Sequence, residues 1–154
     1  LVLIAFGGID MQLPIAEWPP IAGARWLVPQ AWQLACPNAS DFDPLERPFT
    51  DILRSVDAVI AKPGYGTFTE AACNRTPVLY LRRQDWPEQD CLISWLQRHA
   101  QCREISEADL LAGQLDGAQA AVWQQIAPPT PVPSGADEAA KALLPWLTLA
   151  EDCG

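Results

Sequence analysis

Residues 57–70 read Asp57-Ala-Val-Ile-Ala-Lys62 and then Pro63-Gly-Tyr-Gly-Thr-Phe-Thr-Glu70, and this stretch decides the fold. The apolar run predicts a buried strand, the glycines predict a turn, and the residues after them predict a helix start. Such a junction suits an anion or a nucleotide, because N–H groups in the first helical turn lack intrahelical partners and the helix dipole favours negative charge. Gly64 and Gly66 allow positive φ and a close approach of a ligand to the backbone.

Working outward, short apolar runs alternate with amphipathic stretches, which predicts a Rossmann-like three-layer α/β fold with a parallel sheet. The expected strands are 1–6, 25–29, 58–61, 77–81 and 102–105. The expected helices are 49–56, 67–74, 88–101, 106–113, 116–126 and 136–147. Prolines leave room for a short helix at most in residues 9–23, and residues 36–48 are loop-like.

The chain divides into three parts on composition. Residues 1–126 form the expected Rossmann-like domain, 127–135 a proline-rich linker, and 136–154 a C-terminal helix and tail. Ligands of parallel sheets bind beyond the carboxyl ends of the strands. The turns after strands 1–6, 58–61 and 77–81 should therefore converge on one crevice.

Charge and cysteine content exclude some classes of partner and indicate a cellular compartment. The net charge of −9 argues against nucleic acid as a partner, which needs clustered Lys and Arg. No apolar run is long enough to span a membrane. Five scattered cysteines form no C-x-x-C pair, which fits buried thiols at Cys73, Cys91 and Cys102 and a reducing cytoplasm.

The segment Gly64-Tyr-Gly-Thr67-Phe-Thr-Glu70 also resembles the Gly-x-x-Thr-x-x-Glu signature of GT-B fold glycosyltransferases, in particular family 28. Pro77-Val-Leu-Tyr-Leu81 and Asp85-Trp-Pro-Glu-Gln89 resemble the strand and the glutamine-bearing loop that follow this signature. Leu1-Val-Leu-Ile-Ala-Phe-Gly-Gly8 is similar to the strand and turn that open the same half-domain. The resemblance spans roughly residues 1–105 and implies the C-terminal, donor-binding half of a GT-B fold.

The resemblance implies a nucleoside-diphosphate sugar, most readily a UDP-sugar, as the ligand. Glu70 would bind the ribose hydroxyls, the backbone of Gly64–Thr67 would face the diphosphate, and Glu88 and Gln89 would approach the donor sugar. Gly7 and Gly8 would border the same crevice, and Tyr65 would stack on a base or close the turn. Lys62 or Arg82 would add positive charge to the diphosphate, and neither a metal nor a cofactor is expected.

The catalytic base and the acceptor site of such enzymes lie on an N-terminal half. We read the chain as a fragment whose partner is that missing N-terminal domain, so that the chain alone transfers no sugar and its catalytic residues are unknown. His99 is expected to serve a helix dipole or solvent instead.

Alternatives remain open for both the residues and the function. Thr67-x-x-Glu70 and Asp85-x-x-Glu88 also fit capping boxes, which would explain these residues without a ligand. At the level of function, the alternatives are a non-catalytic nucleotide-binding or scaffolding domain of GT-B fold and a sugar-nucleotide epimerase-like protein.

Overall fold

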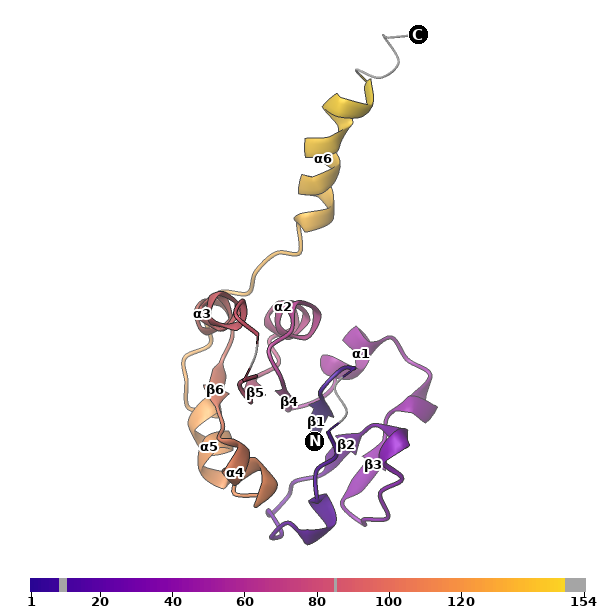
Figure 1. The fold of residues 1–154 in the computed structure, drawn as a ribbon, viewed down its shortest axis with the longest axis vertical. Helices are drawn as coiled ribbons and strands as arrows, with labels where there is room; N and C mark the ends of the chain where they lie inside the picture. The colour runs from indigo at the N-terminus through magenta and orange to yellow at the C-terminus, as the bar shows by residue number, and fades with distance from the viewer. Residues whose placement is uncertain (9–10, 85, 149–154) are drawn as a thin grey trace.

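The computed structural model describes residues 1–8, 11–84 and 86–148. Within them, six strands form one sheet in the order β3-β2-β1-β4-β5-β6, and every neighbouring pair is parallel (Figure 1). The strands are β1 (Val2–Ala5), β2 (Trp26–Val28), β3 (Ala39–Asp41), β4 (Ala58–Ala61), β5 (Val78–Tyr80) and β6 (Cys102–Glu104). This all-parallel sheet confirms the predicted Rossmann-like α/β fold class.

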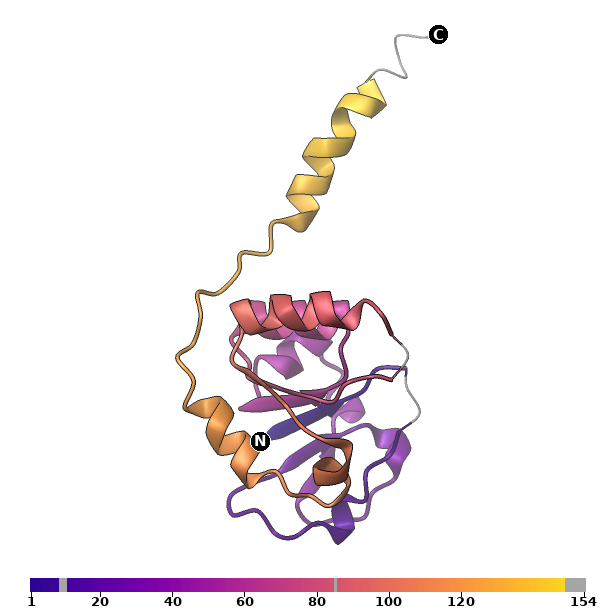
Figure 2. The same cartoon turned by 60° about the vertical axis from the view of Figure 1, so that its left-hand side comes forward.

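Helices cover both faces of the sheet. The α-helices are α1 (Phe49–Leu53), α2 (Tyr65–Asn74), α3 (Gln89–His99), α4 (Glu107–Leu111), α5 (Asp116–Trp123) and α6 (Gly135–Thr148). Short 3-10 helices lie in the connections, namely η1 (Ile15–Glu17), η2 (Gln30–Trp32) and η3 (Asp43–Leu45). Figure 2 shows α2 and α3 above the sheet and α4 and α5 below it.

Two hydrophobic cores explain the continuous apolar runs of the central strands. Leu3, Val59 and Val78 pack against α1, α2 and α3 on one face. Ile4, Ile60 and Leu79 pack on the opposite face, where Leu110, Leu115 and Val122 come from α4, α5 and the turn between them. A strand that is buried on both faces reads as an unbroken apolar run, which is why 58–61 was predicted with the correct bounds.

One predicted loop and one predicted buried cysteine differ from the structure. Residues 36–48 are not only loop, because β3 pairs with β2 at the sheet edge, with Ala39 opposite Trp26. This edge strand is short and partly exposed, so it lacks an apolar pattern. Cys91 is exposed rather than buried, because the buried side chains of α3 are Leu92, Ile93 and Leu96. Cys102 is buried as predicted, and Cys73 is half-buried.

The C-terminal part extends away from the sheet domain. Residues 127–134 contain no helix or strand, and α6 continues outward beyond α2 and α3 (Figures 1 and 2). Its side chains at 136–146 are exposed, including Leu143 and Trp146. None of the described helices is long and apolar enough to cross a membrane.

Candidate functional site

The sheet order places a natural ligand crevice between β1 and β4. The chain runs outward from β1 to β3, then returns to the other side of β1, so the order reverses at this pair of strands. Open α/β sheets bind ligands at such a switch point, beyond the carboxyl ends of the strands. Phe6, Gly7 and Gly8 follow β1, and Lys62 follows β4. Because β1, β4 and β5 are parallel neighbours, the turns that follow them lie at the same edge of the sheet.

A cavity of about 640 Å³ lies at this edge. Its walls come from the ends of β1, β2 and β3 and from the starts of α1 and α2. They are formed by Ala5, Phe6, Gly7, Gly8, Met11, Gln12, Pro29, Ala31, Trp32, Phe42, Phe49 and Thr67. Gly7 has φ +61°, a left-handed conformation that glycine adopts without strain. The cavity therefore joins the predicted residues Gly7 and Gly8, from the turn after β1, with Thr67 from the first turn of α2.

The turn before α2 is shorter than expected. The helix was predicted from Thr67, but α2 begins at Tyr65, so Gly66 lies inside the helix. Gly64 is the N-cap with φ −162°, which is ordinary extended backbone and does not use the positive φ that glycine allows. A Cβ added at Gly66 would meet no atom within 4 Å in the described part of the chain. Among the described residues, no side chain caps α2, so the N–H groups of its first turn are available to a ligand at the carboxyl edge.

The predicted capping box at Thr67 and Glu70 is wrong for the same reason. Both residues lie inside α2, and no side chain caps the helix at Gly64. In the second predicted box, Asp85 lies outside the described residues. Glu88 is itself the N-cap residue of α3, without a side-chain cap bond. Capping therefore explains neither Thr67 nor Glu70.

Glu70 lies in a different hollow from Thr67. This groove measures about 700 Å³ and is lined by Thr50, Asp51 and Arg54 of α1, by Thr69, Glu70, Cys73 and Asn74 of α2, by Trp95, and by residues 131–136. The two hollows meet where α1 passes α2, since Phe49 and Thr67 line the cavity while Thr50 and Glu70 line the groove. A ligand in the cavity would have to reach across this contact to touch Glu70.

Tyr65 and Glu88 form a cluster over the loop that follows β5. The Tyr65 hydroxyl donates to Glu88 Oε2 at 2.7 Å, and this bond is the main cause of the raised pKa of the Tyr65 phenol. The Tyr65 ring meets the Trp86 ring edge-on at 5.7 Å between centroids. The Arg83 guanidinium lies 4.8 Å from the centroid of the Trp86 ring. These contacts fasten the loop to the start of α2.

Gln89 holds the same loop from its other end. Its Oε1 accepts from the Arg83 N–H at 2.9 Å, and its Nε2 donates to the Arg83 carbonyl at 2.7 Å. Both ends of the amide are therefore engaged by backbone. In this arrangement Gln89 positions the loop, and contact with a donor sugar would require these bonds to change.

Sequence reasoning missed the aromatic walls of the cavity. Trp32 follows β2, Phe42 directly follows β3, and Phe49 begins α1. Phe42 could have been found only if the polar segment Ala39–Asp41 had been recognised as a strand, since its place at the carboxyl edge depends on that pairing. Trp32 carried no signal beyond its position after a predicted strand.

A metal site receives no support from the side chains. Asp41-Phe42-Asp43 forms an Asp-x-Asp pair, but Asp43 Oδ2 accepts from the Gln30 N–H at 2.7 Å. In residues 1–8, 11–84 and 86–148, no three His, Cys, Asp or Glu side chains gather closely enough to hold a metal ion.

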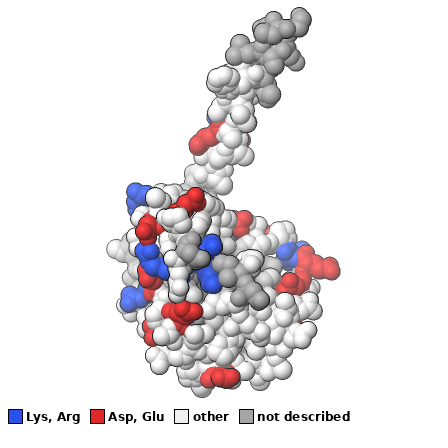
Figure 3. Space-filling model, viewed as in Figure 1, with Lys and Arg blue, Asp and Glu red and all other residues white. Residues whose placement is uncertain are grey.

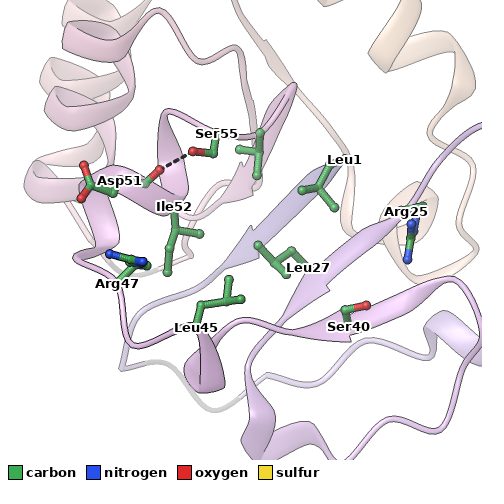
Figure 4. A pocket seen from close by; sticks show the side chains of 10 residues that line it. Leu1, Arg25, Leu27, Ser40, Leu45, Arg47, Asp51, Ile52 and Ser55 are labelled. Carbon is green, nitrogen blue, oxygen red and sulfur yellow. Dashed lines mark hydrogen bonds between the residues drawn. The ribbon is translucent and has the colours of Figure 1, made fainter.

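A further hollow of about 660 Å³ lies between α1 and the face of β2 and β3. Figure 4 shows Leu27, Leu45 and Ile52 around its apolar centre, with Arg25 and Arg47 on opposite sides. It contains none of the predicted site residues, and it lies on a face of the sheet instead of at the carboxyl edge.

No family model matches the chain, and no curated protein sequence matches it. Among solved structures, the chain is similar to the glycosyltransferase SnogD from Streptomyces nogalater, with 18% sequence identity and a TM-score of 0.49. The match covers 93% of this chain and 42% of the SnogD chain, so the chain spans less than half of that protein. We therefore rest the fold on the sheet itself and take no functional residue from SnogD.

Proposed function

We propose that this chain is the nucleotide-sugar donor-binding domain of a GT-B glycosyltransferase, which transfers a hexosyl group from a nucleoside-diphosphate sugar. The observation that carries the proposal is the cavity at the β1–β4 switch point, where Gly7, Gly8 and Thr67 meet. Its volume lies within the roughly 300–1,000 Å³ that is usual for small-molecule sites. The likeness of residues 57–89 to family 28 supports the same reading.

The cavity offers different surfaces to the two halves of a nucleotide. Trp32, Phe42 and Phe49 provide apolar and aromatic walls for a base. Gly7, Gly8 and the first turn of α2 provide backbone near the diphosphate. When the glycosidic bond breaks, the departing nucleoside diphosphate gains negative charge. Fixed backbone donors and the dipole of α2 would stabilise that charge. We propose UDP as the nucleotide.

Transfer itself would need a second domain. The acceptor site and the catalytic base are proposed to lie on an N-terminal half, so purified residues 1–154 should show no sugar transfer. The unpaired thiols of Cys36, Cys73, Cys91 and Cys102 suit a reducing compartment, and we propose a cytoplasmic location.

A non-catalytic domain of the same fold is the second candidate. Two observations favour it: Glu70 does not line the cavity, and the Gln89 amide is occupied by the backbone of Arg83. In that case the fold would persist while contacts to ribose and sugar are lost.

Thermal unfolding with added nucleotide tests the proposal. A ligand that binds only the folded state stabilises it by RT ln(1 + [L]/Kd), so the melting temperature rises with ligand concentration. We expect a concentration-dependent rise with UDP and with a UDP-hexose, and a smaller rise with ADP. If none of the three changes the melting temperature at millimolar concentration, the donor-binding function is wrong and the non-catalytic alternative takes its place.

A further inference from the structure

The sequence offers two cations, Lys62 and Arg82, that could contact the diphosphate. Arg82 already has two acidic partners: its Nη1 lies 2.6 Å from Asp90 Oδ1, and its Nε lies 3.1 Å from Glu104 Oε2. The hydrogen bond to Asp90, followed by that to Glu104, raises the pKa of Arg82. Figure 3 shows basic and acidic side chains lying side by side over α3 and β6. Asp90 and Glu104 therefore already neutralise the positive charge of Arg82, which leaves little of it to attract a diphosphate.

The other nearby cations are also engaged. The Arg83 guanidinium lies on Trp86, in the loop after β5. Arg75 Nε donates to Thr130 Oγ1 at the far, C-terminal end of α2. Neither arrangement directs a charge toward the cavity at the end of β1.

Lys62 differs from these residues in position and in partner. It directly follows β4, which is the strand that pairs with β1 at the switch point. Its Nζ lies 5.6 Å from the centroid of the Phe6 ring, and Phe6 is part of the cavity wall. No ion pair joins Lys62 to a carboxylate in the part of the chain that the structure describes. An aromatic face attracts an ammonium more weakly than a phosphate does, so the contact with Phe6 is readily exchanged.

We propose that Lys62 is the residue that selects a phosphorylated nucleotide in the cavity, by moving its ammonium from the face of Phe6 to the diphosphate. This inference rests on the proposed function, since it concerns a ligand of the same cavity. In a chain with net charge −9, the long-range field repels an anion, and a cation held against the cavity wall at Phe6 offsets that repulsion locally. Lys62 would then determine affinity for the phosphates and leave affinity for the nucleoside unchanged.

Calorimetric titration with UDP and with uridine tests Lys62 apart from the rest of the cavity. We expect Lys62→Met to lower UDP affinity by about tenfold, as for loss of a charge-assisted contact, and to leave uridine affinity unchanged. Lys62→Arg keeps the charge and should bind UDP within about threefold of the parent. Arg82→Met removes the same charge from outside the cavity and should leave both affinities unchanged, which makes it the matched control.

The outcomes distinguish the role of Lys62 from the proposed nucleotide site itself. If Lys62→Met binds UDP as tightly as the parent, or loses uridine and UDP equally, the role of Lys62 is wrong while the nucleotide site stands. An equal loss in Arg82→Met would likewise overturn it, because the effect would then be one of net charge alone. If the parent binds neither UDP nor uridine, the proposed function fails, and the role of Lys62 fails with it.

Discussion

Thr67 and Glu70 lie one helical turn apart on α2, yet they line different hollows. Sequence spacing predicted that both residues reach the carboxyl edge of the sheet, and for Thr67 this is the case. It did not reveal that α1 passes α2 between them, because that contact depends on how β3 and α1 pack. Because Glu70 lines the groove and not the cavity, its role in ribose binding requires a direct test.

Glu70→Gln separates ligand binding from folding. The residue lies inside α2 and caps nothing, so we expect the melting temperature to change little. Removing its charge should lower UDP affinity on the order of tenfold if the carboxylate binds the ribose hydroxyls. Calorimetric titration measures this, with Thr69→Val as a control on the same groove. Unchanged UDP affinity in Glu70→Gln would remove Glu70 from the site.

Gly113 shows how one residue fixes the packing below the sheet. It has φ +67°, and a Cβ added there would lie 2.4 Å from Trp18 Cγ. We expect Gly113→Ala to lower the free energy of unfolding by roughly 2–4 kcal/mol, from backbone strain and overpacking together. Gly117→Ala in α5 meets no atom within 4 Å among the described residues and should be neutral or slightly stabilising. Urea unfolding compares the two variants, and equal stability would contradict this account of Gly113.

At the scale of elements, burial decided which strands were predictable. β4 was predicted with the correct bounds because both of its faces are buried, which leaves an unbroken apolar run. β3 was missed because Ala39–Asp41 is a partly exposed edge strand without such a run. The same holds for the cavity. Its β1 and α2 sides were predicted from the glycine turns, whereas Phe42 in its aromatic wall directly follows β3 and was missed together with that strand.

β6 contains a buried thiol that makes stability depend on pH. Burial raises the pKa of Cys102 to about 11, from an ordinary value of 9.0. Above pH 9 the thiol ionises in the unfolded chain but stays protonated in the folded one. The unfolded state then binds fewer protons, so stability falls as pH rises from about 9 to 11.

We expect this effect to reach roughly 2 kcal/mol at pH 11, from a difference of about two pKa units. Cys102→Ala costs some stability at every pH because it removes a buried side chain, but its stability should decline less steeply between pH 9 and 11. Urea unfolding at several pH values gives both slopes. The same slope in parent and variant would show that the Cys102 thiol is not protected from ionisation.

At the scale of the whole molecule, α6 stands apart from the sheet domain (Figure 2). The boundaries predicted from composition, with a linker at 127–135, remain a proposal that truncation tests. A chain ending at Ser134 retains both hydrophobic cores and the Arg75–Thr130 hydrogen bond. We expect its melting temperature to lie within a few degrees of the parent, measured by circular dichroism. A large loss of stability on truncation would mean that α6 belongs to the folded domain.

The central claim is that the cavity at the β1–β4 switch point binds a nucleoside diphosphate. Gly8→Leu tests it most directly, because Gly8 lines the cavity and a Cβ added there meets no atom within 4 Å in the described residues. Gly117→Leu makes the same change at an exposed position of α5 outside the cavity and serves as the control. In calorimetric titrations with UDP, we predict binding to the parent and to Gly117→Leu, and a loss of at least tenfold in Gly8→Leu at unchanged melting temperature. Equal UDP binding by Gly8→Leu and the parent, or no binding by either, would contradict the assignment of this cavity.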